Sequence, residues 1–73
     1  MTHRVILVHT TSSAIRVEKL LKKAGLEVKL VPVPRHLSSD CGVSVRIAAA
    51  DEERCREILA GNCVEFERIE PIR

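Results

Sequence analysis

Residues 5–25 read VILVHTTSSAIRVEKLLKKAG and decide the first half of the fold. The opening β-branched and apolar run predicts a central strand that is buried on both faces. The Thr and Ser residues at 10–13 are typical N-cap types, and Gly25 is typical of the residue that follows a helix. Between them the apolar residues recur at helical spacing, so we expect a helix over about 12–24. That apolar stripe comprises Ala14, Val17, Leu20, Leu21 and Ala24.

Two more strands and a long loop follow this helix. Residues 26–30 alternate between apolar and charged side chains, which predicts a half-exposed second strand. Pro32 ends it, because proline cannot donate a hydrogen bond to a neighbouring strand. The segment 32–42 is rich in Pro, Ser, Asp and Gly and is expected to be a loop. Residues 43–48 alternate again and predict a third strand.

The C-terminal third predicts one more helix and one more strand. Asp51 is expected to cap a helix whose apolar stripe contains Cys55 and which stops at Gly61 or Asn62. Residues 64–67 alternate between apolar and acidic side chains and predict the fourth strand. The tail after that strand is expected to be loose.

The resulting order, β-α-β-β-α-β, predicts an α+β fold in a single domain over residues 1–73. Two right-handed crossovers interleave into a ferredoxin-like sandwich with antiparallel sheet order 4-1-3-2 and two helices on one face. The other face is then expected to expose apolar residues of the first strand. That open face is a candidate homodimer interface.

Composition narrows the classes of function. A chain of 73 residues that is 45% hydrophobic and 30% charged should fold, but it has no room for a deep substrate cleft. A net charge of +2 and a single aromatic residue, Phe66, argue against binding to nucleic acid. The longest uncharged apolar run, residues 5–8, is far too short to span a membrane, and residues 1–4 lead into a strand-like run rather than the apolar region of a signal peptide, so we expect neither a membrane span nor a signal peptide. We therefore expect a cytoplasmic protein.

The expected topology brings distant segments together at one edge of the sheet. This edge is the side on which strand ends meet, not an outermost strand. The end of the first strand, the start of the first helix, the 32–42 loop and the starts of the last two strands all meet there. Cys41 should therefore lie close to His9, Thr10 and the first turn of the helix. Unpaired N–H groups at a helix N-terminus lower the pKa of a nearby thiol and make it nucleophilic. Cys41 is our candidate reactive residue.

Several neighbours could bind an anion held at Cys41. The guanidinium of Arg35 and the hydroxyls of Ser38 and Ser39 belong to the same loop, and Gly42 gives it backbone freedom. His9, Thr10 and Thr11 belong to the facing strand end and helix start. None of the three histidines has metal-ligand spacing, so we expect no metal. A zinc site built from Cys41, Cys63, His9 and His36 is a geometric alternative.

The other two cysteines have different expected roles. Cys55 lies on the apolar stripe of the second helix and is expected to be an inert core thiol. Cys63 is expected to open the fourth strand at the same edge as Cys41. A disulfide between Cys41 and Cys63 would need movement of the loop, because a disulfide requires Cα atoms within about 7 Å.

The chain resembles a family of short bacterial and archaeal proteins described as selenium/sulfur carrier protein-like. The resemblance covers nearly the whole chain and is most specific at Pro34-Arg35 and Ser38–Gly42. It implies that Cys41 carries a persulfide or selenopersulfide, with Arg35 and the helix N–H groups stabilising the terminal anion. It also implies donor and acceptor proteins as partners, no cofactor, and a carrier rather than a turnover enzyme.

Two other hypotheses remain open. The chain could be a non-catalytic module that binds a small anion or metabolite through the 32–42 loop. It could also be a thiol redox protein that pairs Cys41 with Cys63.

Overall fold

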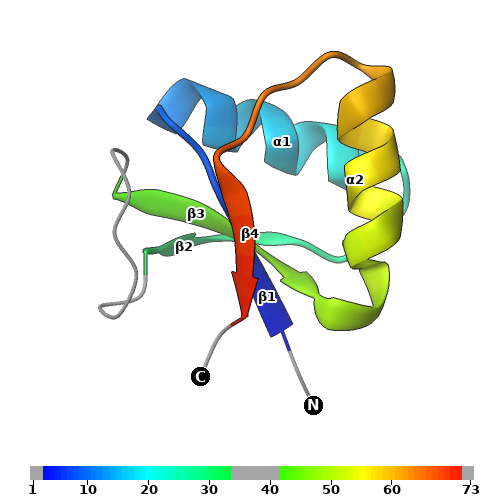
Figure 1. Cartoon of the computed structure of the whole chain (residues 1–73), viewed down its shortest axis with the longest axis horizontal. Helices are drawn as coiled ribbons and strands as arrows, with labels where there is room; N and C mark the ends of the chain where they lie inside the picture. Colours follow the sequence, from blue (N-terminus) through cyan, green and yellow to red (C-terminus); the bar gives the residue numbers. More distant parts are fainter. Residues whose placement is uncertain (1–2, 34–41, 72–73) are drawn as a thin grey trace.

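The computed structural model describes residues 3–33 and 42–71, and these form an α+β domain with two helices and four strands (Figure 1). The elements follow the order expected from the sequence, with a short 3₁₀ turn, η1, before the second helix. Their bounds are β1 His3–Leu7, α1 Thr11–Lys23, β2 Lys29–Pro32, β3 Val43–Ala48, η1 Ala49–Asp51, α2 Glu52–Gly61 and β4 Arg68–Pro71.

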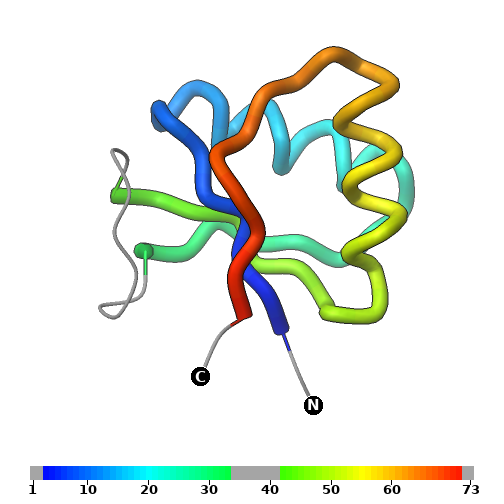
Figure 2. The backbone as a smooth tube through the Cα atoms, in the orientation of Figure 1, coloured from blue at the N-terminus to red at the C-terminus, as the bar shows by residue number. Residues whose placement is uncertain are grey.

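The four strands form one antiparallel sheet of order β2-β3-β1-β4. Read from its other edge, this is the predicted order 4-1-3-2, which is therefore confirmed. β1 pairs with β3 on one side and with β4 on the other, and Ile6 lies opposite both Val45 and Ile69. The backbone trace of β4 runs back along β1 (Figure 2). In the register of this pair Arg4 lies opposite Pro71.

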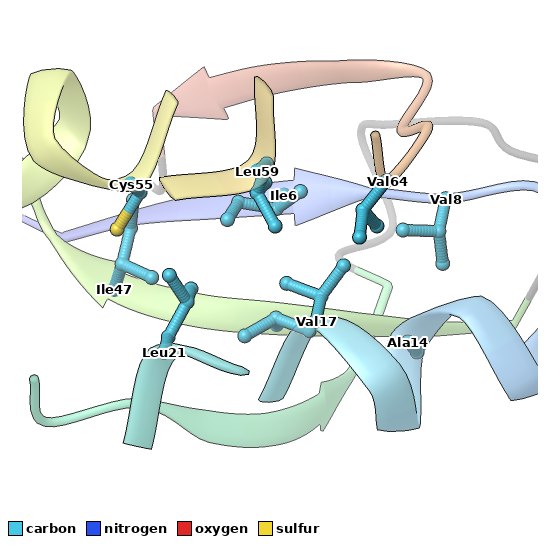
Figure 3. Close-up of a cluster of buried hydrophobic side chains, with 10 residues drawn as sticks. Ile6, Val8, Ala14, Val17, Leu21, Ile47, Cys55, Leu59 and Val64 are labelled. Carbon is cyan, nitrogen blue, oxygen red and sulfur yellow. The ribbon is translucent and has the colours of Figure 1, made fainter. Parts of the chain in front are cut away.

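The hydrophobic core lies between the sheet and both helices (Figure 3). Strand residues alternate in direction, so Ile6 and Val8 face the helices while Val5 and Leu7 face away. Both helices contribute to this one cluster, which places them on the same face of the sheet, as expected. The cluster comprises Ile6, Val8, Ala14, Val17, Leu21, Val45, Ile47, Cys55, Leu59 and Val64.

The two helices begin in different ways. α1 starts within one residue of the expected position, and the Ser13 N–H donates to the Thr10 hydroxyl oxygen at 3.1 Å. α2 starts after Asp51, as predicted, but the Asp51 side chain makes no capping hydrogen bond there. A separate 3₁₀ turn, η1, directly precedes α2.

Both helices end in the same backbone arrangement, a Schellman motif. At the end of α1 the Leu26 N–H donates to the Leu21 carbonyl at 3.1 Å, and the residue between the cap and Leu26 is Gly25 with φ +89°. At the end of α2 the Val64 N–H donates to the Leu59 carbonyl at 2.9 Å. The left-handed residue there is Cys63, with φ +54°.

These turns explain why two strand predictions were displaced. Residues 26–28 follow the α1 turn without strand pairing, so β2 begins at Lys29 and includes Pro32 rather than stopping before it. Proline is tolerated because β2 is an edge strand. In the same way residues 64–67 connect α2 to β4, which runs from Arg68 to Pro71. The part of the expected loose tail at Glu70 and Pro71 is therefore strand.

The sheet face away from the helices is less open than expected. Val5 and Leu7 point to this face, yet neither has any exposed surface. In the register, Val5 lies between Arg46 and Glu70, and Leu7 lies between Ser44 and Arg68. Three of these four neighbours carry long charged side chains, which flank the apolar pair on this face. The expectation of an exposed apolar patch on β1 is therefore wrong.

An ion-pair network lies on this same face along β4. Arg68 contacts the carboxylates of Glu67 and Glu70, each at 2.7 Å. The hydrogen bond that Arg68 donates to the Glu70 carboxylate is the main cause that raises the pKa of Arg68. No helix in the described part of the chain is long and apolar enough to cross a membrane.

Candidate functional site

The predicted site divides between described and undescribed residues. Cys41, Arg35, Ser38 and Ser39 lie outside the residues that the structure describes, as does His36 of the alternative zinc site. The described members of the site are His9, Thr10, Thr11 and Gly42.

The expected meeting of chain segments at one sheet edge is confirmed for its described members. Leu7, at the end of β1, lies opposite Ser44 near the start of β3 and opposite Arg68 at the start of β4. Pro32, at the end of β2, lies opposite Val43. Beyond this pair the Val33 N–H donates to the Gly42 carbonyl at 3.1 Å. The chain on both sides of segment 34–41 is thus held in the sheet's hydrogen-bonding pattern.

The start of α1 reaches the same edge. The Thr10 hydroxyl accepts from the Ser13 N–H and donates to the Ser13 hydroxyl oxygen, both at 3.1 Å. The first turn of α1, which the structure describes in full, contains no acidic residue. The partial positive charge of this helix end is therefore not offset by a carboxylate within its own first turn.

A shallow apolar hollow of about 320 Å³ lies between α1 and the ends of β2 and β3. Thr11 and Gly42 both line it, so the structure brings together the first residue of α1 and the residue that follows Cys41 in sequence. Ile15, on the second turn of α1, also lines the hollow and is 40% exposed. The other described residues that line the hollow are Leu30, Val31, Pro32 and Val43.

The structure separates His9 from this hollow. His9 lines a second hollow of about 480 Å³ together with Arg56 and Ala60 of α2 and with residues 64–66. Thr10 lines neither hollow and acts as the helix cap. Thr11 and Gly42 therefore lie together, as predicted, whereas His9 lies in the hollow beside α2.

Sequence reasoning missed Ile15 as a surface residue of this region. Ile15 falls outside the apolar stripe of α1, and a large apolar side chain off that stripe was the available signal. The apolar residues of β2 and β3 that line the hollow were read only as strand residues. Their position beside Thr11 follows from the packing of α1 on the sheet.

Comparison with known proteins identifies the family. The family model described as "Putative Se/S carrier protein-like" matches residues 3–71. The chain belongs to this family. No curated protein and no solved structure matches the chain.

Within this Se/S carrier-like chain, the two described cysteines are in opposite environments. Cys55 is fully buried in the core, and burial, followed by the charges of Asp51 and Glu52, raises its pKa to about 11. Such a thiol stays protonated near neutral pH and is a poor nucleophile, as predicted. Cys63 is a free, exposed thiol.

The predicted position of Cys63 is wrong. Cys63 occupies the turn after α2, whereas β4 begins only at Arg68. The Cys63 N–H donates to the Ala60 carbonyl at 3.2 Å as part of the helix end. Within residues 3–33 and 42–71, no group of three or more His, Cys, Asp and Glu side chains could hold a metal ion.

Proposed function

We propose that the chain is a sulfur or selenium carrier that holds the transferred atom on Cys41 as a persulfide or selenopersulfide. The observation that carries this proposal is the family match over residues 3–71, a span that includes Cys41 and its loop neighbours Arg35, Ser38 and Ser39. A carrier works with a donor and an acceptor protein and requires no deep cleft, which suits a chain of this length.

The described geometry supports activation of a thiol at this position. Gly42 directly follows Cys41 and lines the same hollow as Thr11, at the start of α1. A helix N-terminus without an acidic first turn favours the thiolate over the thiol. We propose that this helix end and Arg35 lower the pKa of Cys41 and stabilise the terminal anion of its persulfide.

The transfer requires no external oxidant. The Cys41 thiolate attacks the terminal sulfur of a donor persulfide; a new S–S bond forms at Cys41, the donor's S–S bond breaks, and the donor leaves as a thiolate. The sulfane sulfur keeps its oxidation state. An acceptor nucleophile then attacks that terminal sulfur, and Cys41 leaves as a thiolate. Selenium follows the same sequence with an S–Se bond.

The proposal extends to the wider setting of the chain. We propose that its βαββαβ order and its sheet order belong to the ferredoxin-like class, with residues 1–73 as a single cytoplasmic domain. A homodimer through the sheet face away from the helices also stays a prediction. Because Val5 and Leu7 are covered on that face, such a dimer would rely on its charged residues.

Intact-mass measurement tests the carrier proposal. Reduced protein is treated with a donor persulfide or with a donor selenopersulfide, in the wild type, Cys41→Ser and Cys63→Ser. We expect a gain of about 32 Da for sulfur, or about 80 Da for selenium, that is lost only in Cys41→Ser. Cys63→Ser is the matched control because it removes the other non-core thiol.

Two other results would replace the proposal. A loss of about 2 Da on oxidation that either variant abolishes indicates a Cys41–Cys63 redox pair. No adduct in any form, together with ligand binding that Cys41→Ser leaves unchanged, indicates an anion- or metabolite-binding module. Cys41 alkylation followed against pH tests the activation step: a pKa at or above about 8.5 contradicts it.

A further inference from the structure

Two like charges face each other across β2 and β3 without a carboxylate partner. Lys29 lies directly opposite Arg46 in the antiparallel register. Both point away from the helices, because Arg46 alternates with the core residues Val45 and Ile47. Neither makes an ion pair within the part of the chain that the structure describes. Like charges directly opposite each other destabilise a strand pair, so this pairing has an electrostatic cost.

Four other cations of the described chain have carboxylate partners. Arg68 is held by two glutamates on the same sheet face, Arg4 and Arg56 share Glu52, and Lys22 contacts Glu18. On the sheet face away from the helices, Arg68 is thus paired with carboxylates, whereas Lys29 and Arg46 lie opposite each other without an ion pair among the described residues. An anion placed between the two side chains would relieve their repulsion.

A hollow of about 340 Å³ lies at this position, where β1 and β2 begin and β3 ends. Its lining is mainly polar. Lys29 and Arg46 contribute to it together with His3, and Glu27 and Asp51 add two carboxylates. The volume is at the lower end of the range for small-molecule sites, which fits a ligand of modest size.

We propose that this hollow binds a small polar molecule that carries one anionic group, a phosphate or a carboxylate, beside an ammonium or hydroxyl donor. The anionic group lies between Lys29 and Arg46, where it accepts charge-assisted hydrogen bonds from both. The donor group is received by Glu27 or Asp51, whose charges disfavour a ligand that is anionic throughout. His3 closes the cationic side of the hollow.

This site is distinct from the proposed carrier site. Lys29 begins β2, whereas Val33 and Gly42 flank segment 34–41 beyond the other end of that strand. The hollow contains no cysteine among its described lining residues. Its binding can therefore be measured without any persulfide chemistry, and Cys41→Ser protein serves equally well.

Amide chemical shifts in ¹⁵N-labelled protein test the proposal with three related probes: phosphoethanolamine, inorganic phosphate and ethanolamine. We expect phosphoethanolamine to shift the amides of His3, Lys29 and Arg46 in a saturable manner. Inorganic phosphate should bind more weakly, because it lacks the donor, and ethanolamine should not bind. In Glu27→Gln/Asp51→Asn protein the advantage of phosphoethanolamine over phosphate should disappear.

Charge-matched variants separate a site from a general charge effect. Lys29→Gln/Arg46→Gln should weaken phosphoethanolamine binding by about tenfold or more. Arg16→Gln/Lys19→Gln removes the same charge from exposed positions of α1 and should leave binding unchanged. Equal weakening in both variants would overturn the proposal, as would shifts confined to residues outside the hollow. Thermal unfolding of each variant confirms that it remains folded.

Discussion

The two helices pack on the same core, but they differ at both ends. α1 begins with a threonine cap and no acidic residue, whereas α2 begins with Glu52 and Glu53 and no side-chain cap. The dipole of α2 is thus offset from within its own first turn, whereas no acidic side chain in the first turn of α1 offsets that of α1. The difference teaches that only the start of α1 has the electrostatic character that the proposed carrier site requires.

The C-terminal ends share one motif built on different residues. Gly25 adopts the left-handed backbone at no steric cost, whereas Cys63 adopts it against the preference of an L side chain. The hydrogen bonds are otherwise equivalent. Position 63 therefore holds an exposed thiol where glycine would be the more stable choice.

Removing a core leucine from either helix should have the largest effect. Leu21→Ala and Leu59→Ala should each lower the free energy of unfolding by about 3 kcal/mol, because both side chains are fully buried in one cluster. Urea unfolding measures both. The control is Ile15→Ala, which removes a partly exposed side chain and should cost less than about 1 kcal/mol. A small loss in only one of the two leucine variants would show that the helices do not share a core.

The buried thiol of α2 should make stability fall at high pH. Its pKa is raised from 9.0 to about 11, chiefly by burial. Below pH 9.0 the thiol is protonated in both the folded and the unfolded chain, and its contribution is complete. As the pH rises from 9.0 toward about 11, the unfolded chain loses the proton first, and stability should fall by about 2–3 kcal/mol.

Denaturant unfolding at several pH values in this window provides the measurement. Cys55→Ala is the reference, because it removes the titrating group and should flatten that part of the pH dependence. If the wild type and the variant lose stability in parallel, other groups cause the loss.

Exchanging residues at the helix ends should change stability in opposite directions. Gly25→Ala should destabilise the protein by about 1 kcal/mol because Gly25 has a positive φ. A steric clash does not contribute, because the added Cβ would meet no atom within 4 Å. Cys63→Gly should stabilise it by about 0.5–1 kcal/mol. Thermal unfolding reports both changes. Cys63→Ala separates the effect of the positive φ from the effect of the thiol, because alanine keeps the backbone strain. If Cys63→Ala stabilises the protein as much as Cys63→Gly does, loss of the thiol is the cause of the stabilisation.

Placing a carboxylate in the first turn of α1 should have the smallest effect on stability. It should also change the reactivity of the Cys41 thiol. Ser12→Asp should stabilise the helix by about 0.5 kcal/mol through its dipole. The same charge should raise the pKa of Cys41 and slow its alkylation at neutral pH. Glu53→Gln on α2 is the converse control and should leave Cys41 alkylation unchanged. Faster alkylation in Ser12→Asp would contradict the proposed activation.

The element order, the sheet order and the first helix could be predicted because each depends on a strong local pattern. The strands after the helices could not be placed correctly, since alternation in residues 26–30 and 64–67 resembles that of a strand. In the structure, Leu26 and Val64 instead supply the apolar contact that follows a Schellman turn. Only the tertiary packing distinguishes these two uses of an apolar residue.

The sequence predicted where in the fold the candidate site lies better than it predicted which residues of the site contact one another. Topology alone places Thr11 and Gly42 at one edge, and the structure confirms this. It does not determine that His9 faces α2, because that depends on how the 64–66 connection crosses the edge. Nor could sequence reveal that Val5 and Leu7 are covered, since the flanking of Leu7 by Arg68 depends on the shifted register of β4.

The hydrogen bond between Val33 and Gly42 has a consequence for engineering. It joins the residues on either side of segment 34–41 and continues the pairing of β2 with β3, so the alignment of these strands does not depend on that segment alone. Replacing it with the corresponding stretch from another family member, or lengthening it, should leave the scaffold intact, because loop-closure entropy grows only slowly with length. The same frame can then present different reactive loops for direct comparison.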